Sequence, residues 1–252
     1  MISDDKLKQI GEVAIKYVSP FITTITGVMK DQNISPVYIG TGCYLNFNKH
    51  TYILSAKHVA DNLSTYDYLF EGGGELMHPI QGHWVATDIP EADTAVMGCF
   101  PELLTNDEKI LDYKDTLFSS NHSEDTYYLV LGYPGKLHTN LDFMKQHQHV
   151  SISLLTKLQS VNTNKNGDDI LFKLHYSKDN VVPPGISGSP VWNLNVNDKT
   201  TEWDVSKITF AGIVTRWHEG DQTILVTNAE LVKHVLPTIT NKFRELYPRD
   251  DK

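Results

Sequence analysis

Cysteine is scarce in this sequence. Only Cys43 and Cys99 occur among 252 residues. Two cysteines are too few for the disulfide framework of a small secreted protein or for a zinc site made of thiolates. We therefore expect both to be small strand residues in a reducing compartment, with a single disulfide across the fold as the alternative.

A basic excess and long apolar runs are also missing. Lys and Arg total 22 against 31 Asp and Glu, which gives a formal net charge of −9, and no basic cluster points to nucleic acid as a partner. No apolar run approaches the roughly 18 residues that a membrane-spanning helix needs. Asp4, Asp5 and Glu12 lie where a signal peptide would be basic and then apolar. We expect no membrane association and a cytoplasmic location.

Cofactor motifs are sparse as well. His147 and His149 have the spacing of one strand face, but no third ligand follows at a recognisable distance. The glycine run 72–74 lacks the Lys-Ser/Thr of a phosphate-binding loop. The sequence therefore predicts neither a metal ion nor a cofactor.

Short apolar stretches separated by Asn, Gly and Pro predict a fold made mainly of β-strands. The first group of expected strands covers residues 21–28, 37–47, 52–55, 66–70, 78–86 and 94–99. The second group covers residues 127–132, 150–161, 170–176, 190–194, 208–215 and 223–226. Six strands in each group are enough for two β-barrels.

Apolar residues at helical spacing predict a helix at residues 4–18, ended by Pro20, and another at 229–247, interrupted by Pro237. A chain of this length can fold as one continuous unit with a substantial core. The expected parts are an N-terminal helix (1–20), a first barrel (21–100), a connection with a short helix (101–125), a second barrel (126–228) and a C-terminal helix with a tail (229–252).

Three short motifs supply the groups that acyl transfer requires. Leu-Ser-Ala-Lys-His ends at His58, Ala-Asp-Thr-Ala-Val contains Asp93, and Gly-Ile-Ser-Gly-Ser-Pro contains Ser187. A serine hydroxyl is a weak nucleophile, so it needs an imidazole to take its proton and a carboxylate to orient that imidazole. Glycines at 185 and 188 allow a sharp bend, which would direct the amides of Gly185 and Ser187 toward one point as an oxyanion hole.

In this order the motifs resemble those of the chymotrypsin-like (trypsin-like) serine proteases. That family has Gly-x-Ser-Gly-Gly/Ser-Pro at its serine, Ser/Thr-Ala-x-His at its histidine and Asp-x-Ala-Val/Leu at its aspartate. The resemblance spans roughly residues 20–235. It implies two six-stranded antiparallel barrels with an active site in the cleft between them. It also implies a serine endopeptidase that cleaves a polypeptide, in which His58 is general base and acid, Asp93 orients it and Ser187 attacks.

Each assignment has a competitor in the sequence. Ser187 between glycines is also compatible with a surface turn, and His58 with a core histidine. Asp88 and Glu91 share the loop of Asp93, but only Asp93 comes directly before an apolar strand. Two other classes stay open: a catalytically silent protease fold that binds or regulates a partner, and an α/β-type esterase. The esterase motif Gly-x-Ser-x-Gly has Ser189 in place of its last glycine.

The same resemblance implies residues for substrate binding. Val181 would form the floor of the primary pocket and Trp217 would narrow its wall, with Arg216 beside it. Thr215 would donate a hydrogen bond to Asp93, and backbone groups of residues 215–217 would bind an extended substrate. These positions predict cleavage after small or modest apolar residues, with acidic residues second and basic ones disfavoured.

Activation by a new N-terminus is not expected, because Ile186 stands where the digestive enzymes of the family carry an aspartate. A regulatory protein or ordering of residues 101–125 and 135–149 would then control activity.

Overall fold

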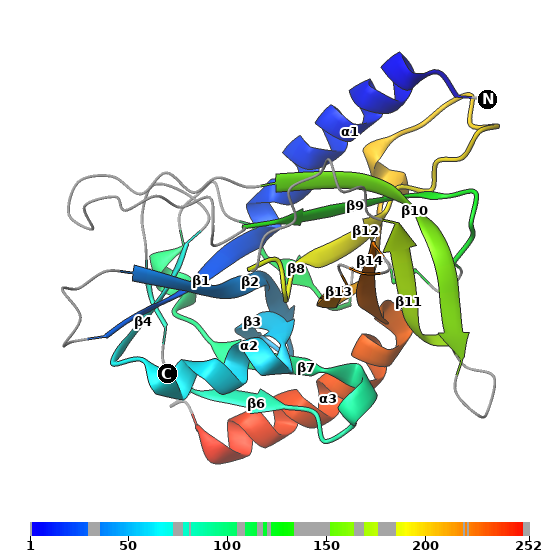
Figure 1. Cartoon of the computed structure of the whole chain (residues 1–252). Coiled ribbons are helices and arrows are strands. Elements are labelled where there is room, and N and C mark those ends of the chain that lie inside the picture. Colours follow the sequence, from blue (N-terminus) through cyan, green and yellow to red (C-terminus); the bar gives the residue numbers. More distant parts are fainter. Residues whose placement is uncertain are drawn as a thin grey trace.

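The computed structural model describes residues 2–29, 36–72, 78–80, 82–104, 109–114, 118–119, 122–133, 152–163, 169–175, 185–218, 220 and 222–248. Val181, His147, His149 and the predicted regulatory loop 135–149 lie outside the described residues. The described part is mostly β-structure with a helix at each end (Figure 1). The predicted mainly-β architecture is thereby confirmed.

The second strand group forms the expected closed barrel. Its strands are β9 (Tyr127–Gly132), β10 (Ile152–Thr163), β11 (Asp169–His175), β12 (Pro190–Asn193), β13 (Thr209–His218) and β14 (Thr223–Asn228). They follow each other around the barrel in the order β10-β11-β14-β13-β12-β9, and every neighbouring pair is antiparallel. Alternate side chains fill the interior, among them Tyr128, Phe172 and Ile224.

The first group forms an eight-stranded sheet of half-barrel shape, not the predicted closed six-stranded barrel. Its strands are β1 (Ile22–Val28), β2 (Pro36–Phe47), β3 (His50–Ala56), β4 (Tyr68–Gly72), β5 (His78–Pro79), β6 (Trp84–Ala86), β7 (Thr94–Gly98) and β8 (Leu111–Asp112). The order is β5-β4-β1-β2-β3-β7-β6, and β8 pairs with β2 in parallel.

The predicted strand 78–86 is in fact two short strands. Pro79 has no amide hydrogen for a ladder, and Gly82 has a φ of +70°, so the strand cannot continue between them. The two pieces lie at opposite ends of the sheet, and the described residues show no pairing that joins those ends. The sheet is therefore open in the part of the chain that the structure describes.

The helix α1 (Asp4–Val18) has the predicted bounds, and the side chain of Ser3 caps it by accepting from the Lys6 amide. The helix α3 (Ala229–Leu246) runs through Pro237, so the predicted interruption is wrong. Pro237 removes one helical hydrogen bond, but the helix buries an apolar face on both sides of it, including Val232, Val235, Leu236, Ile239 and Phe243. That burial holds the helix continuous.

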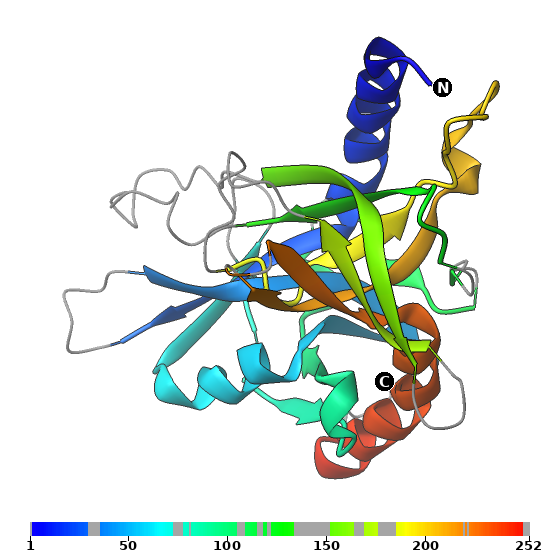
Figure 2. The same ribbon diagram turned by 45° about the vertical axis from the view of Figure 1, so that its right-hand side comes forward.

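One apolar core links the two sheets. It runs from Val18 of α1 through Leu45 and Leu131 to Phe243 of α3, and α3 contacts β6 and β7 as well as β13 and β14. Figure 2 shows α1 at one end of the molecule and α3 at the other. No described helix is long and apolar enough to cross a membrane. The shared core fixes the two sheets against each other, which any site between them requires.

Candidate active site

His58 lies at the start of a short helix that follows a buried strand. Strand β3 ends at Ala56, and α2 (Lys57–Asp61) begins at the next residue. The amide of Lys57 donates to the carbonyl of Asp93 at 2.9 Å, which ties this turn to the loop before β7. The His58 side chain is 44% exposed, so part of it is open to solvent.

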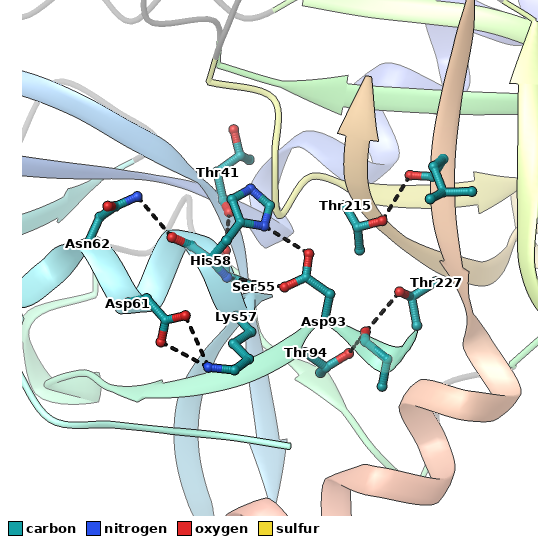
Figure 3. A network of polar contacts seen from close by, with 12 residues as sticks. Thr41, Ser55, Lys57, His58, Asp61, Asn62, Asp93, Thr94, Thr215 and Thr227 are labelled. Atoms are coloured by element: carbon teal, nitrogen blue, oxygen red, sulfur yellow. Dashed lines mark hydrogen bonds and ion pairs between the residues drawn. The ribbon is translucent and has the colours of Figure 1, made fainter. Parts of the chain in front are cut away.

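Asp93 accepts two hydrogen bonds from His58. The carboxylate Oδ2 lies 2.8 Å from Nδ1 of the ring, and Oδ1 lies 3.1 Å from the His58 amide nitrogen (Figure 3). An ionised carboxylate only accepts, so Nδ1 donates, and the neutral ring then carries its free lone pair on Nε2. This is the tautomer in which an imidazole can take a proton from a hydroxyl.

The backbone at Asp93 is unusual for a residue with a side chain. Asp93 has φ +36° and ψ +46°, the left-handed conformation, directly after the 3₁₀ turn η3 (Pro90–Ala92). The carbonyl of Ala92 accepts from the hydroxyls of Thr94, at 2.6 Å, and Thr227, at 2.8 Å. Thr227 belongs to β14, so a strand of the second barrel helps to hold this turn.

The two acidic rivals of Asp93 lie elsewhere. Asp88 is 95% exposed on its side chain and lies 3.8 Å from the ammonium group of Lys242. Glu91 is exposed too. Of the three candidates, Asp93 is the one that contacts His58.

The serine loop is a tight turn that leads into β12. The amide of Ser189 donates to the carbonyl of Ile186, and Gly188 N–H donates to Val214 of β13. Gly185 and Gly188 have φ values of +118° and +85°, which favour glycine, as the sequence predicted for a sharp bend. Ser187 therefore sits in a tight turn that is hydrogen-bonded to the barrel.

The same loop packs against the first sheet. The amide of Thr41 in β2 donates to the carbonyl of Ser187 at 2.9 Å. A Cβ added to the neighbouring Gly40 would lie 2.7 Å from Cγ2 of Val59 and 3.0 Å from the Ser187 carbonyl oxygen. Val59 follows His58, so the structure brings the backbone of Ser187 beside the helix that carries His58.

Sequence reasoning missed the strand residues that join the loop to the sheet. Thr41 and Ser55 are buried and polar, and the Ser55 hydroxyl donates to the Thr41 carbonyl at 2.7 Å. The run Gly-Thr-Gly at 40–42, two glycines inside an otherwise apolar strand, was the available signal, because strand glycines mark close backbone approaches.

The predicted bond from Thr215 to Asp93 is not the one that the structure shows. The Thr215 hydroxyl donates to the carbonyl of Leu225 at 3.3 Å. Between Val214 and Arg216 the register of β13 shifts against β14, and this bulge leaves Thr215 without a cross-strand partner. Its hydroxyl bridges the irregularity instead.

The neighbouring substrate-binding candidates lie at the end of β13. Arg216 is exposed. Trp217 is half-buried and packs on the apolar cluster that contains Ile186, the residue before Ser187. Trp217 is thus placed near the serine loop. Ile186 is part of that buried cluster. It stands where the digestive enzymes carry an aspartate, so the serine loop has no carboxylate at this position.

Burial argues against either cysteine as a nucleophile. Cys43 and Cys99 are buried and form no disulfide. Burial raises the pKa of the Cys43 thiol to about 12, which keeps it protonated at neutral pH, and a thiol must ionise to attack. Within the described residues, no three His, Cys, Asp or Glu side chains are grouped to bind a metal ion.

No family model and no curated protein matched the sequence. Solved structures did match. The active form of the M. tuberculosis protease Rv3671c aligns with a TM-score of 0.57 and 15% identity, over 92% of this chain and 86% of that one. An inactive form of Rv3671c, carrying a serine-to-alanine mutation, aligns with a TM-score of 0.56 and 14% identity, over 95% and 98%.

The closed barrel and the half-barrel sheet are together consistent with a double β-barrel fold. At 14 to 15% identity the likeness concerns the fold and supports a chymotrypsin-like architecture coarsely. The observed fold excludes an α/β-type esterase. That enzyme class needs a parallel sheet between helices, whereas the barrel strands here are antiparallel.

Proposed function

We propose that this chain is a serine endopeptidase with His58, Asp93 and Ser187 as its catalytic triad. The observation that carries the proposal is the pair of hydrogen bonds from His58 to Asp93, at 2.8 and 3.1 Å. The fold of the chain and the packing of the serine loop beside α2 support it.

The proposed reaction proceeds by acyl transfer. Nε2 of His58 takes the proton of the Ser187 hydroxyl as its Oγ attacks the carbonyl carbon of the scissile peptide bond. The amides of Gly185 and Ser187 stabilise the resulting oxyanion. The C–N bond then breaks, and the imidazolium gives its proton to the leaving amine. Water, deprotonated by His58, hydrolyses the acyl-enzyme and restores Ser187.

Asp93 has an electrostatic and an orienting role in this scheme. Its carboxylate faces the imidazolium that forms in the transition state, and its second oxygen is held by the His58 amide. Both oxygens are therefore fixed before the reaction begins, so little reorganisation accompanies charge formation.

The substrate is proposed to bind as an added strand. Strand β12 begins at Pro190, whose partner in β13 is Ile213, while β13 continues to His218. Among the described residues, Arg216 and Trp217 pair with β14 and not with β12, and Thr215 lies at the bulge between them and Val214. An extended polypeptide can pair with such an edge through its backbone. We propose a specific protein as the substrate and a cytoplasmic site of action.

Peptide hydrolysis tests this function. The purified chain is incubated with a mixed peptide library, and the products are read by mass spectrometry. The proposal predicts cleavage by the wild type and a loss on the order of a thousandfold or more in Ser187→Ala, which keeps its thermal unfolding temperature. Equal cleavage by both proteins would reject the assigned nucleophile. A wild type that folds but cleaves nothing would favour a silent protease-fold binding module.

A further inference from the structure

Thr41 makes a set of contacts that the triad alone does not explain. It lies on β2, fully buried, between the serine loop and the strand that leads to His58. All three of its hydrogen-bonding groups are used. The amide donates to the carbonyl of Ser187 at 2.9 Å, the hydroxyl donates to Gly185 at 3.0 Å, and the carbonyl accepts from Ser55 at 2.7 Å.

The hydroxyl of Thr41 also accepts a hydrogen bond. The amide of Tyr133, directly after β9, donates to it at 3.0 Å. One side chain of the first sheet therefore bonds to two segments of the second barrel. Near it, a Cβ added to Gly132 would lie 2.0 Å from the Ser189 oxygen and 3.3 Å from the Thr41 hydroxyl oxygen. This packing leaves the turn little room to shift.

These bonds fix the carbonyls on either side of the Ser187 amide. The carbonyls of Gly185 and Ser187 point at Thr41, and the Ile186 carbonyl accepts from the Ser189 amide at 2.9 Å. The Ile186 carbonyl and the Ser187 N–H belong to the same peptide bond. In a trans peptide these two groups point in opposite directions. The Ser187 N–H is thus directed away from the interior of the turn, as an oxyanion donor must be.

We propose that Thr41 is a positioning residue whose hydroxyl holds the Gly185–Ser189 turn in the conformation that forms the oxyanion hole. This inference rests on the proposed serine endopeptidase function. Thr41 does not touch the substrate in this account, and it acts through the Gly185 carbonyl. Loss of the hydroxyl leaves that carbonyl free to rotate and misaligns the amides on which transition-state stabilisation depends.

The test compares Thr41→Val with Thr41→Ser and a matched control. Valine keeps the shape and removes the hydroxyl, whereas serine restores it. Thr24→Val is the control, because Thr24 lies directly opposite Thr41 on β1, is equally buried and donates its hydroxyl to a backbone carbonyl, that of Gly72, at 2.7 Å. Its bond does not involve the serine loop.

Two readouts are measured on each variant: peptide-hydrolysis kinetics, and hydrogen–deuterium exchange of the peptide that covers residues 185–189. Thr41→Val is expected to lower kcat by roughly ten- to a hundredfold with KM within about twofold, and to speed exchange in that peptide. Thr41→Ser is expected to recover most of the kcat. Thr24→Val is expected to match the wild type in both readouts.

The outcomes separate this inference from the proposed function. Unchanged exchange and unchanged kcat in Thr41→Val would overturn the positioning role while leaving the endopeptidase proposal intact. Equal losses in Thr24→Val and Thr41→Val would also overturn it, because the effect would then be a general cost of a buried hydroxyl. If the wild type is inactive but Thr41→Val still speeds exchange at 185–189, the proposed function is wrong and the anchoring by Thr41 stands.

Discussion

The hydroxyl of Thr227, in the second barrel, donates a hydrogen bond of 2.8 Å to the carbonyl of Ala92, the residue before Asp93. This bond crosses from one sheet to the other next to the Asp93 carboxylate, which accepts from His58 (Figure 3). The strained turn at Asp93 is thus held from both halves of the molecule. We expect the geometry of the His58–Asp93 hydrogen bonds to depend on how the two sheets pack together.

Thr227→Val is expected to weaken both stability and turnover. Removing one buried hydrogen bond costs about 1 kcal/mol of unfolding free energy, and the Ala92 carbonyl keeps its second donor, Thr94. Urea denaturation and peptide-hydrolysis rates measure the two effects, with Thr227→Ser as the control that retains the hydroxyl. A stability loss with unchanged kcat would show that this bond does not position Asp93.

Asp93→Asn is expected to reduce turnover by about ten-thousandfold near neutral pH. An asparagine amide can donate to Nδ1, which places the ring hydrogen on Nε2, where the serine proton must go. Asp88→Asn, in the same loop but 95% exposed on its side chain, is expected to retain wild-type rates. Steady-state kinetics of the two variants measure which carboxylate supports His58. A larger loss of turnover in the Asp88 variant would contradict the assignment of Asp93.

Gly188→Ala is expected to destabilise the fold and abolish activity. Its φ of +85° disfavours any side chain, and a Cβ there would lie 2.0 Å from both the Ser55 hydroxyl and the Thr41 carbonyl oxygen. Backbone strain alone costs on the order of 1–3 kcal/mol, and the overlap adds to it. Thermal unfolding measures the effect. Gly220→Ala, which has no atoms within 4 Å of the added Cβ, is the control and is expected to unfold as the wild type does.

The specificity expected from Val181, Arg216 and Trp217 remains a prediction. A pocket without a carboxylate leaves a buried substrate cation unpaired, which costs several kcal/mol. Cuts in the peptide library should follow small or modest apolar residues, then acidic ones. Arg216→Ala should lower the share of cuts after acidic residues and leave the others unchanged. Dominant cutting after Lys or Arg would show that the pocket is assigned wrongly.

Much of the fold is readable from local pattern. Helix α1 and strand β9 have the predicted bounds because strong apolar periodicity coincides with clear punctuation, such as Pro20 after the helix. Long-range packing decided the rest. The helix α3 continues through Pro237 because its buried face outweighs one lost hydrogen bond, and β8 exists because β2 offers it an edge. Neither effect is visible in a window of neighbouring residues.

The site shows the same division. His58, Asp93 and the glycines at 185 and 188 lie in short local motifs, so the sequence could predict the His58–Asp93 contact and the bend at the glycines. Thr215 lies at a bulge, and a register shift between two strands cannot be read from one of them. The contacts of Thr41 join segments 144 residues apart, which only the folded chain brings together.

The central claim is that Ser187 is a nucleophile activated by His58. The most direct measurement is the labelling of the folded chain by a fluorophosphonate, with the modified residue located by mass spectrometry. The account predicts one label per chain, on Ser187, and slow or absent labelling in His58→Ala, because the hydroxyl then lacks its base. No labelling of the wild type, or a label on another serine, would contradict the account.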